Sequence, residues 1–315
     1  MSKIIAVAGA TGAQGGGLVR AILADKSGGF AARALTRDPG SDKAKALADL
    51  GADVVQADLH DPASVRRAFE GAYGAYCVTF FWAHMSTETE LAEARSMAEA
   101  AKSARLQHVI CSTLEDTRKF VPLSDNRMPT LMGRYKVPHF DVKGEADALF
   151  AASGVPVTYL VTSFYWENFI YFGMNPKKGA DGKLALSLPM ADKKLSGIAA
   201  EDIGKTAYAI FKKGPAATGG KRIGIAGEHL TGAEIAAKMS KALGQDITYN
   251  AVPFEVFRNL GFPGADDLGN MFQVYAEFEK PLADARDLAK TRALNPELQT
   301  FDQWLARNKE KIPLE

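Results

Sequence analysis

The sequence predicts an α/β protein built on a doubly wound parallel sheet, with a second, smaller α/β domain. Short apolar runs of β type alternate with helical patterns through the first half of the chain. These runs lack the apolar–polar alternation of half-exposed strands, so the strands are expected to be buried on both faces. Right-handed crossover connections between such strands give a doubly wound sheet.

Each element of the first half follows from this pattern. Between the apolar runs, amphipathic stretches indicate helices. The predicted strands are residues 4–8, 31–36, 53–57, 75–80, 108–112 and 157–162. The predicted helices are residues 16–24, 43–50, 63–69, 87–104 and 140–152.

The pattern changes after residue 162. Residues 163–172 are rich in aromatic side chains, 183–189 indicate a short strand, 201–211 a helix, and 221–226 one more strand of the main sheet. Thr231 and Glu234 have the spacing of a capping box, which predicts a helix ending at Leu243. A short strand and several helices follow, the last at 301–311. We therefore expect one domain at 1–162, rejoined by about 198–227, and a smaller substrate-side domain at 163–197 and 228–315.

Residues 114–137 form a long connection with little periodicity. Connections longer than about 12–15 residues without regular structure are usually functional or disordered. We therefore interpret this segment as a candidate lid that a ligand orders.

Composition excludes several classes of protein. The 315 residues contain 38 basic and 37 acidic side chains, with no long run of either sign. A basic stripe of the kind that binds nucleic acid or an anionic membrane is therefore not expected. Two cysteines cannot form a disulfide framework or a four-cysteine zinc site, and no apolar run approaches the roughly 18 residues that span a bilayer. Without a charged leader before residue 4, a cytoplasmic location is expected.

The strongest motif is Gly9-Ala10-Thr11-Gly12-Ala13-Gln14-Gly15, between the first predicted strand and the first helix. Glycines at this spacing permit a tight turn, close approach of the backbone to a pyrophosphate, and close packing of helix on strand. The helix N-terminus supplies N–H groups and a positive dipole end for phosphate. The motif predicts a dinucleotide-binding Rossmann domain.

The end of the second predicted strand indicates which nucleotide is bound. A site for NAD would place an acidic residue there to hold the ribose 2′-hydroxyl, whereas this chain has Thr36 and Arg37. A guanidinium suits a 2′-phosphate through its charge and paired donors. We predict NADP(H) as the cofactor, although Asp38 lies beside the arginine and a solvated surface arginine is the alternative.

Several motifs together resemble the NmrA-like family, a group of atypical short-chain dehydrogenases/reductases. The resemblance covers residues 4 to about 311 and is nearest to the redox-sensing members with NmrA-like domains. The motifs are GATGAQGG at 9–16, LTRDP at 35–39, GADVVQAD at 51–58, HFDVKGE at 139–145, YWEN at 165–168, LGFPG at 260–264 and DQW at 302–304.

The resemblance implies an NADP(H)-binding Rossmann fold and a set of nucleotide-contacting residues. Besides the glycine loop these are Arg37, Asp58, Leu59, Thr79, Phe80, Phe81, Lys143, Tyr165, Trp166, Glu167 and Asn168. The redox-sensing relatives carry a lysine four residues after the arginine, where this chain has Ser41, with Lys43 nearby.

Several of these residues could instead have a purely structural role. Asp58 follows the third predicted strand, where it would contact adenine or cap a turn. The aromatic residues at 80–82 and 165–172 would line a ligand pocket or pack in the core or between domains.

The resemblance also implies where catalysis would occur. Active members of the wider superfamily use Tyr-x-x-x-Lys, in which the lysine lowers the pKa of the tyrosine that exchanges a proton with substrate. Here the spacing is His139-x-x-x-Lys143, and Ser112 and Thr113 end the fifth predicted strand as hydroxyl candidates. His139 would act as an acid–base or would be a helix N-terminal residue without chemistry.

Other chemistries find no support. The histidines at 60, 84, 108, 139 and 229 show no metal-ligand spacing, so no metal site is predicted, and Cys77 and Cys111 are expected in the core. Two hypotheses remain: a regulator that responds to the redox state of NADP(H), and an NADPH-dependent reductase of a small carbonyl, quinone or imine. A nicotinamide dinucleotide is the expected ligand. A small apolar substrate, a regulatory protein partner and a homodimer stay open.

Overall fold

The computed structural model describes residues 2–179 and 181–314, and its internal contacts divide the chain into two compact units. The first unit comprises Met1–Asp116, Val142–Thr162 and Ala200–Ile223. The second comprises Thr117–Asp141, Ser163–Ala199 and Gly224–Glu315. Residues 117–141 therefore group with the second unit, whereas the sequence analysis assigned them to the nucleotide-binding domain. Each unit is described separately below.

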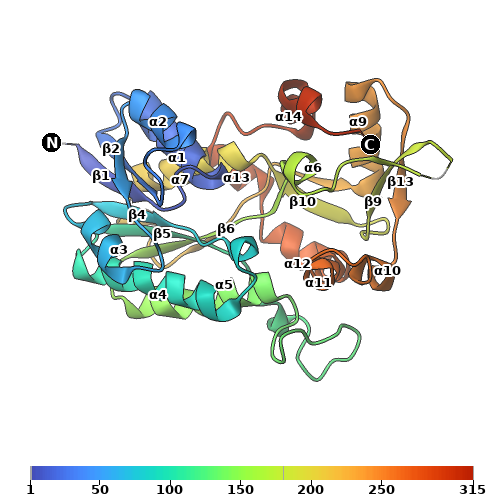
Figure 1. The fold of residues 1–315 in the computed structure, drawn as a ribbon, viewed down its shortest axis with the longest axis horizontal. Coiled ribbons are helices and arrows are strands. Elements are labelled where there is room, and N and C mark those ends of the chain that lie inside the picture. The colour runs from blue at the N-terminus through green and yellow to red at the C-terminus, as the bar shows by residue number, and fades with distance from the viewer. Residues whose placement is uncertain (1, 180, 315) are drawn as a thin grey trace. The chain divides into compact units, whose positions relative to one another are not determined.

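The first unit is built on a large parallel sheet, as the sequence predicted. Among the described residues the sheet has seven strands in the order β11-β6-β5-β4-β1-β2-β3 (Figure 1). The strands are β1 (Lys3–Val7), β2 (Phe30–Thr36), β3 (Asp53–Gln56), β4 (Gly74–Cys77), β5 (His108–Thr113), β6 (Val157–Val161) and β11 (Arg222–Gly224). The six strands of the first half and the returning strand at 221–226 are thus confirmed.

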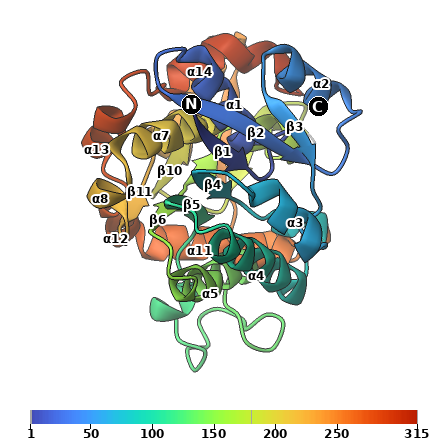
Figure 2. The same ribbon diagram turned by 90° about the vertical axis from the view of Figure 1, so that its left-hand side faces the viewer.

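Helices cover both faces of this sheet. Figure 2 shows α3, α4 and α5 on one face and α1, α2 and α7 on the other. Their bounds are α1 (Ala13–Ala24), α2 (Asp42–Asp49), α3 (Pro62–Phe69), α4 (Thr87–Ser103), α5 (Pro138–Ala152), α7 (Ala200–Lys213) and the short α8 (Pro215–Thr218). On the α3–α4–α5 face a buried core includes Phe69, Met97, Val109 and Phe150. This arrangement is the doubly wound fold.

Chain order along the sheet reverses between β1 and β4. From β1 the chain proceeds through β2 and β3 on one side, and from β4 through β5 and β6 on the other. In such sheets, ligands bind at the carboxyl ends of the strands where the order reverses. The carboxyl ends of β1 and β4 are therefore where the fold predicts a ligand site.

Two element boundaries differ from the predictions, for physical reasons. The predicted strand 75–80 ends at Cys77, because Thr79 bonds to side chains and Phe81–Ala83 form a 3₁₀ turn, η1. Helix α1 begins at Ala13 rather than residue 16, so glycines 15–17 lie within it. A Cβ at Gly17 would lie 2.9 Å from the carbonyl oxygen of Glu201, so this glycine allows α1 to approach α7.

The second unit combines small sheets with helices. Within its described residues there are two three-stranded sheets, of order β12-β10-β7 and β13-β9-β8. The strands are β7 (Phe164–Tyr165), β8 (Lys177–Lys178), β9 (Leu184–Leu188), β10 (Lys194–Ile198), β12 (Glu228–Thr231) and β13 (Ile247–Ala251). The helices are η2 (Thr117–Lys119), α6 (Asn168–Tyr171), α9 (Gly232–Leu243), α10 (Phe254–Arg258), α11 (Ala265–Glu277), α12 (Glu279–Asp284), α13 (Leu288–Leu294), α14 (Phe301–Asn308) and η3 (Lys309–Lys311).

Two features of this unit bear on the predictions. Thr231 and Glu234 form the predicted capping box, and α9 extends to Leu243 as expected. The connection at 117–137 has little regular structure, but it is hydrogen-bonded within the unit: the Asn270 side chain donates to the carbonyls of Pro129 (3.0 Å) and Lys136 (2.6 Å). At Pro129 and Lys136, the backbone of this connection is therefore held by hydrogen bonds to a side chain.

Candidate functional site

The glycine loop joins β1 to α1 at the carboxyl edge of the large sheet. Gly9 has a φ of +62°, which favours glycine, and its carbonyl accepts the N–H of Gly12 at 2.9 Å. A Cβ at Gly15 would lie 2.4 Å from the Gly9 carbonyl oxygen. Helix α1 begins at Ala13, within the glycine motif, and no side chain caps its N-terminus. The loop thus has the tight turn and open helix N-terminus that suit a pyrophosphate.

Arg37 lies at the end of β2, on the same edge of the sheet. Its side chain is exposed. The neighbouring Asp38 carboxylate accepts the backbone N–H of Gly40 at 2.9 Å, which ties it to its own turn. Asp38 therefore has a structural role in this turn, which differs from that of a carboxylate that holds the ribose 2′-hydroxyl of NAD.

Asp58 lies at the corresponding place after β3. Its carboxylate accepts the backbone N–H of His60 at 3.0 Å, and the Asp58 carbonyl accepts that of Asp61 at 2.9 Å. The turn-forming alternative for Asp58 is thus present in the structure. The adjacent Leu59 packs against the core on the α3–α4–α5 face.

The glycine loop connects to the end of β5 through Gln14. The Gln14 side-chain oxygen accepts hydrogen bonds from the hydroxyls of Ser112, at 2.8 Å, and Tyr76, and all three side chains are buried. The Thr113 hydroxyl instead donates to the carbonyls of Lys143 (3.2 Å) and Leu114 (3.3 Å). Both hydroxyl candidates at the end of β5 are therefore engaged in internal hydrogen bonds.

Lys143 projects from α5 to the end of β4, where it meets a carboxylate that the sequence analysis missed. Its ammonium donates to the Thr79 hydroxyl at 2.7 Å and to the Thr79 carbonyl at 3.2 Å, and it forms an ion pair with Glu90 of α4. The Thr79 hydroxyl also donates to Glu90. The Glu90 side chain is 0% exposed, so Lys143 compensates a fully buried negative charge.

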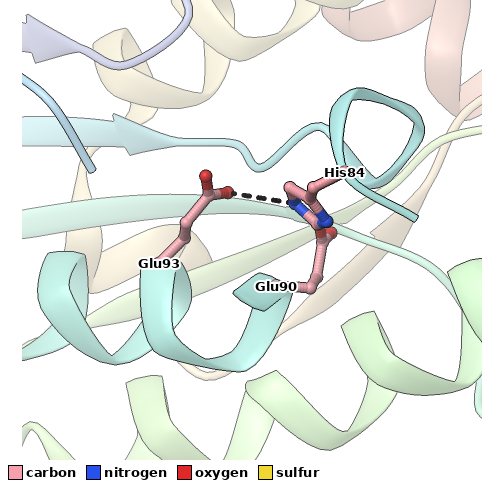
Figure 3. Close-up of side chains that lie close together, drawn as sticks. All are labelled: His84, Glu90 and Glu93. Carbon is pink, nitrogen blue, oxygen red and sulfur yellow. Dashed lines mark ion pairs between the residues drawn. The ribbon is translucent and has the colours of Figure 1, made fainter. Parts of the chain in front are cut away.

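A second carboxylate and two histidines extend this group. His84 Nε2 lies 3.5 Å from a Glu90 oxygen and 3.9 Å from a Glu93 oxygen (Figure 3). The other Glu93 oxygen lies 3.1 Å from Nε2 of His60, whose side chain is half-exposed. We call Lys143, Glu90, His84, Glu93 and His60 the lysine–carboxylate cluster. A signal was present in the sequence, since Glu90 and Glu93 share the face of α4 that carries Ala94 and Met97.

The protonation of this cluster follows from its hydrogen bonds. His84 Nδ1 accepts the backbone N–H of Ser86 at 3.1 Å, so the proton of the neutral ring is on Nε2. Burial lowers the pKa of His84 and so favours that neutral form. Burial, reinforced by the nearby Glu90 charge, raises the pKa of Glu93 to about 7.

The spacing of His84, Glu90 and Glu93 resembles that of a cation site. A histidine ligand must offer a lone pair, however, and here Nε2 carries the proton and points to the two carboxylates. The Lys143 ammonium already neutralises Glu90. We therefore interpret the group as an ion-paired cluster rather than as metal ligands.

Beneath the cluster lies a small cavity of about 10 Å³, lined by residues of β4, β5, α4 and α5 that include Cys77, Cys111 and Lys143. This volume holds about one water molecule and no organic ligand. Cys77 and Cys111 are buried, and burial raises the pKa of both thiols, so they behave as small core side chains.

The remaining predicted site residues belong partly to the second unit. His139 Nδ1 lies 2.6 Å from an Asp267 oxygen, and the His139 backbone N–H donates to the other oxygen at 3.1 Å. Trp166 is buried against Phe301 and Trp304, and Glu167 accepts the indole N–H of Trp304 at 2.9 Å. Trp166 and Glu167 thus contribute to the core of their own unit.

The two other residues of the YWEN motif are also placed within that unit. Tyr165 is half-buried at the end of β7, where it pairs with Ile198 of β10, and Asn168 is the first residue of α6. In the first unit, Phe80 is 56% exposed beyond the end of β4, whereas Phe81 is buried.

The fold and the glycine loop define a Rossmann-type α/β protein of the kind in which dinucleotides bind at the carboxyl edge of the sheet. Within this class, the family model of the NmrA-like family matches residues 1–305, and the chain belongs to that family.

The relatives include proteins of different described roles. An NmrA-like family domain-containing protein of Dictyostelium discoideum is 28% identical over 260 residues, 80% of this chain and 81% of the relative. The NmrA-like family domain-containing oxidoreductase FrzB of Cladobotryum sp is 27% identical over 291 residues, 86% of this chain and 83% of FrzB. The crystal structure of NmrA, a negative transcriptional regulator, in complex with NADP is similar with a TM-score of 0.78 and 25% identity, over 97% of this chain and 94% of that one.

Among the residues that the structure describes, no helix is both long and apolar enough to cross a bilayer.

Proposed function

We propose that this chain binds NADP(H) at the carboxyl edge of the large sheet and acts as a regulator that responds to the redox state of the nucleotide. The glycine loop would hold the pyrophosphate at the N-terminus of α1. Exposed Arg37 at the end of β2 would bind the 2′-phosphate. Solved NmrA structures were crystallised with NADP and with NAD, so they support a nicotinamide dinucleotide, and the choice of NADP(H) rests on Arg37.

One observation favours a regulator over an enzyme. The groups of the first unit that a reductase would use for proton transfer are all bonded internally. Ser112 donates to Gln14, Thr113 donates to backbone carbonyls, and Lys143 is paired with Glu90. A proton donor for a substrate carbonyl would first have to break one of these contacts.

The second candidate function is an NADPH-dependent reductase of a small carbonyl, quinone or imine. Lys143 at the end of β4 is the observation that favours it, because a lysine there would hold the nicotinamide ribose and lend positive charge to the reaction. The oxidoreductase name of FrzB agrees with this candidate.

One experiment separates the two candidates. Purified protein is mixed with NADPH and a panel of carbonyls, quinones and imines, and NADPH oxidation is followed by absorbance. In parallel, hydrogen exchange and oligomeric state are compared with NADPH and with NADP⁺. The regulator predicts no turnover and different behaviour with the two nucleotides. Steady turnover that Lys143→Ala abolishes, with identical behaviour in both nucleotides, would assign the chain to the reductases.

A further inference from the structure

The lysine–carboxylate cluster places an adjustable charge beside the proposed nucleotide site. Lys143 carries one positive charge and the fully buried Glu90 one negative charge, so this pair is neutral. His84 is held neutral by the N–H of Ser86, as argued above. The net charge of the cluster interior therefore depends on whether Glu93, which is 7% exposed, carries its proton.

Every charged group that faces Glu93 can be named. Glu90 precedes it on α4, and His84 follows η1. Lys143 approaches from α5, and His60 and Asp58 from the connection between β3 and α3. His60 lies 3.1 Å from Glu93 and is half-exposed, whereas His84 is mostly buried, so His60 offers the more open route for a proton to leave.

The cluster lies at the end of β4, on the side of the sheet where the nicotinamide half of the nucleotide is expected. If the pyrophosphate sits on the glycine loop and the adenosine extends toward Arg37 and β2, the other half crosses the point of strand reversal toward β4 and β5. Thr79 follows β4, Ser112 ends β5, and Lys143 bonds to Thr79. The nicotinamide is thus the part of the ligand nearest the cluster.

We infer that Glu93, beside the neutralised pair of Lys143 and Glu90, makes this site distinguish oxidised from reduced nicotinamide in a pH-dependent way. The inference rests on the proposed nucleotide function and names the device by which redox state is read. The oxidised ring carries one positive charge, and the reduced ring carries none. When Glu93 is protonated, the cluster has no net charge and favours neither ring. When Glu93 is ionised, its negative charge stabilises the positively charged oxidised ring.

The sign of the effect follows directly. Raising the pH removes the Glu93 proton, so the ratio of the NADP⁺ dissociation constant to the NADPH dissociation constant should fall. We expect a fall of about fivefold between about pH 6 and pH 8, the order expected of one charge acting through an effective dielectric constant of about 20. The 2′-phosphate titrates in the same range, but both nucleotides carry it, so its effect cancels in the ratio.

Proton linkage supplies a second readout. If ionised Glu93 favours NADP⁺, binding of NADP⁺ must lower the proton occupancy of Glu93. The released proton leaves through His60 to the buffer. NADP⁺ binding near neutral pH should release a fraction of a proton, whereas NADPH binding should release less.

The test is isothermal titration calorimetry with NADP⁺ and NADPH at several pH values and in buffers of different ionisation enthalpy. It compares wild type, Glu93→Gln and, as the matched control, Glu99→Gln, whose carboxylate is exposed on the same helix. Wild type and Glu99→Gln should show the pH-dependent ratio and a larger proton release with NADP⁺ than with NADPH. Glu93→Gln should show neither difference, because any proton released from the 2′-phosphate is common to both nucleotides. The wild-type measurements test the inference even if Glu93→Gln does not fold.

Three results would overturn the inference. A ratio that does not change with pH in wild type overturns it while leaving the proposed function intact. A pH dependence that survives in Glu93→Gln but is lost in His60→Gln assigns the effect to the exposed histidine instead. Failure of both nucleotides to bind overturns the proposed function, and the inference with it.

Discussion

Lys143 and Glu90 form an ion pair in which one member has no contact with water. Removing a charge from such a pair costs more than the pair contributes, because the partner is left buried and uncompensated. The Glu90 side chain is 0% exposed and that of Lys143 is 14% exposed. Water therefore cannot solvate the Glu90 charge when Lys143 is removed.

We therefore expect Lys143→Met to lower the free energy of unfolding by about 3 kcal/mol. The double variant Lys143→Met with Glu90→Gln should recover at least half of that loss, because it removes the unpaired charge. Urea unfolding of the four proteins in a double-mutant cycle measures this. Strict additivity of the two single changes would show that the ion pair does not couple the residues.

Glu93 should make stability depend on pH. Burial raises its pKa to about 7 in the folded protein, above the ordinary value of a glutamate in the unfolded chain. The folded state then holds the proton more tightly, so the stabilisation is fully present below the unfolded pKa of about 4.3 and is lost as the pH rises through about 7.

Relative to Glu93→Gln, wild type should lose on the order of 2–3 kcal/mol of stability between about pH 4.5 and pH 8. Unfolding curves of both proteins across this range measure the difference. Parallel pH profiles for wild type and Glu93→Gln would mean that Glu93 titrates as an ordinary surface carboxyl.

Arg37 carries the expected choice of cofactor. If its guanidinium binds the 2′-phosphate, wild type should bind NADPH at least about tenfold more tightly than NADH, a difference of about 1.4 kcal/mol. Arg37→Glu should remove this preference, whereas Lys45→Glu, a charge reversal at an exposed position of α2, should keep it. Fluorescence titration with both nucleotides gives the result, and unchanged selectivity in Arg37→Glu would refute the assignment.

At the scale of elements, the contact of α1 with α7 depends on glycines. A Cβ at Gly204 would lie 2.2 Å from the backbone nitrogen of Leu18. Because the clash is with backbone, a whole helix would have to move to relieve it. Gly17 makes the reciprocal approach to Glu201. Because α1 also carries the glycine loop, this contact fixes the helix whose N-terminus would face the pyrophosphate.

Gly204→Ala should thus destabilise the protein by about 3 kcal/mol through overpacking, although alanine is the better helix former. Lys213→Ala, at an exposed position of the same helix, should change stability by less than about 0.5 kcal/mol. Thermal unfolding compares the two. A stabilised Gly204→Ala would mean that α1 and α7 can separate at little cost.

The elements that the sequence predicted well are those whose signals are local. The six strands of the first half are apolar runs bounded by turns, and Thr231 with Glu234 marks a helix start within four residues. Two boundaries were wrong. Residues 13–15 were assigned to the glycine motif before the helix, although α1 already begins at Ala13. Thr79 was assigned to the fourth strand, because its bonds to Lys143, far along the chain, cannot be seen in the sequence.

The candidate site was predictable only in part, for the same reason. The glycine loop and Arg37 follow from sequence because a βαβ unit fixes where they lie. The lysine–carboxylate cluster does not, since Lys143, Glu90 and His60 come from three different helices or connections. Glu90 and Glu93 share the face of α4 that carries Ala94 and Met97, which marks them as facing inward, but the sequence does not show which side chains meet them there.

Considered as a whole, the chain offers nucleotides two different edges of one sheet. The carboxyl edge carries the glycine loop, Arg37 and the lysine–carboxylate cluster. The opposite edge carries an open groove lined by Lys3, Phe30, Tyr73 and Lys212, among others. This groove also carries basic and aromatic side chains, so a measurement of affinity alone does not tell the two edges apart.

The most direct test of the account is hydrogen exchange of the whole chain, measured by mass spectrometry with and without saturating NADPH. If NADPH binds at the carboxyl edge of the large sheet, exchange should slow in the glycine loop at residues 9–15 and at the strand ends near Arg37 and Thr79, with no change around Lys3 and Lys212. Protection confined to the groove at Lys3 and Lys212, or no protection at residues 9–15 despite binding, would contradict it.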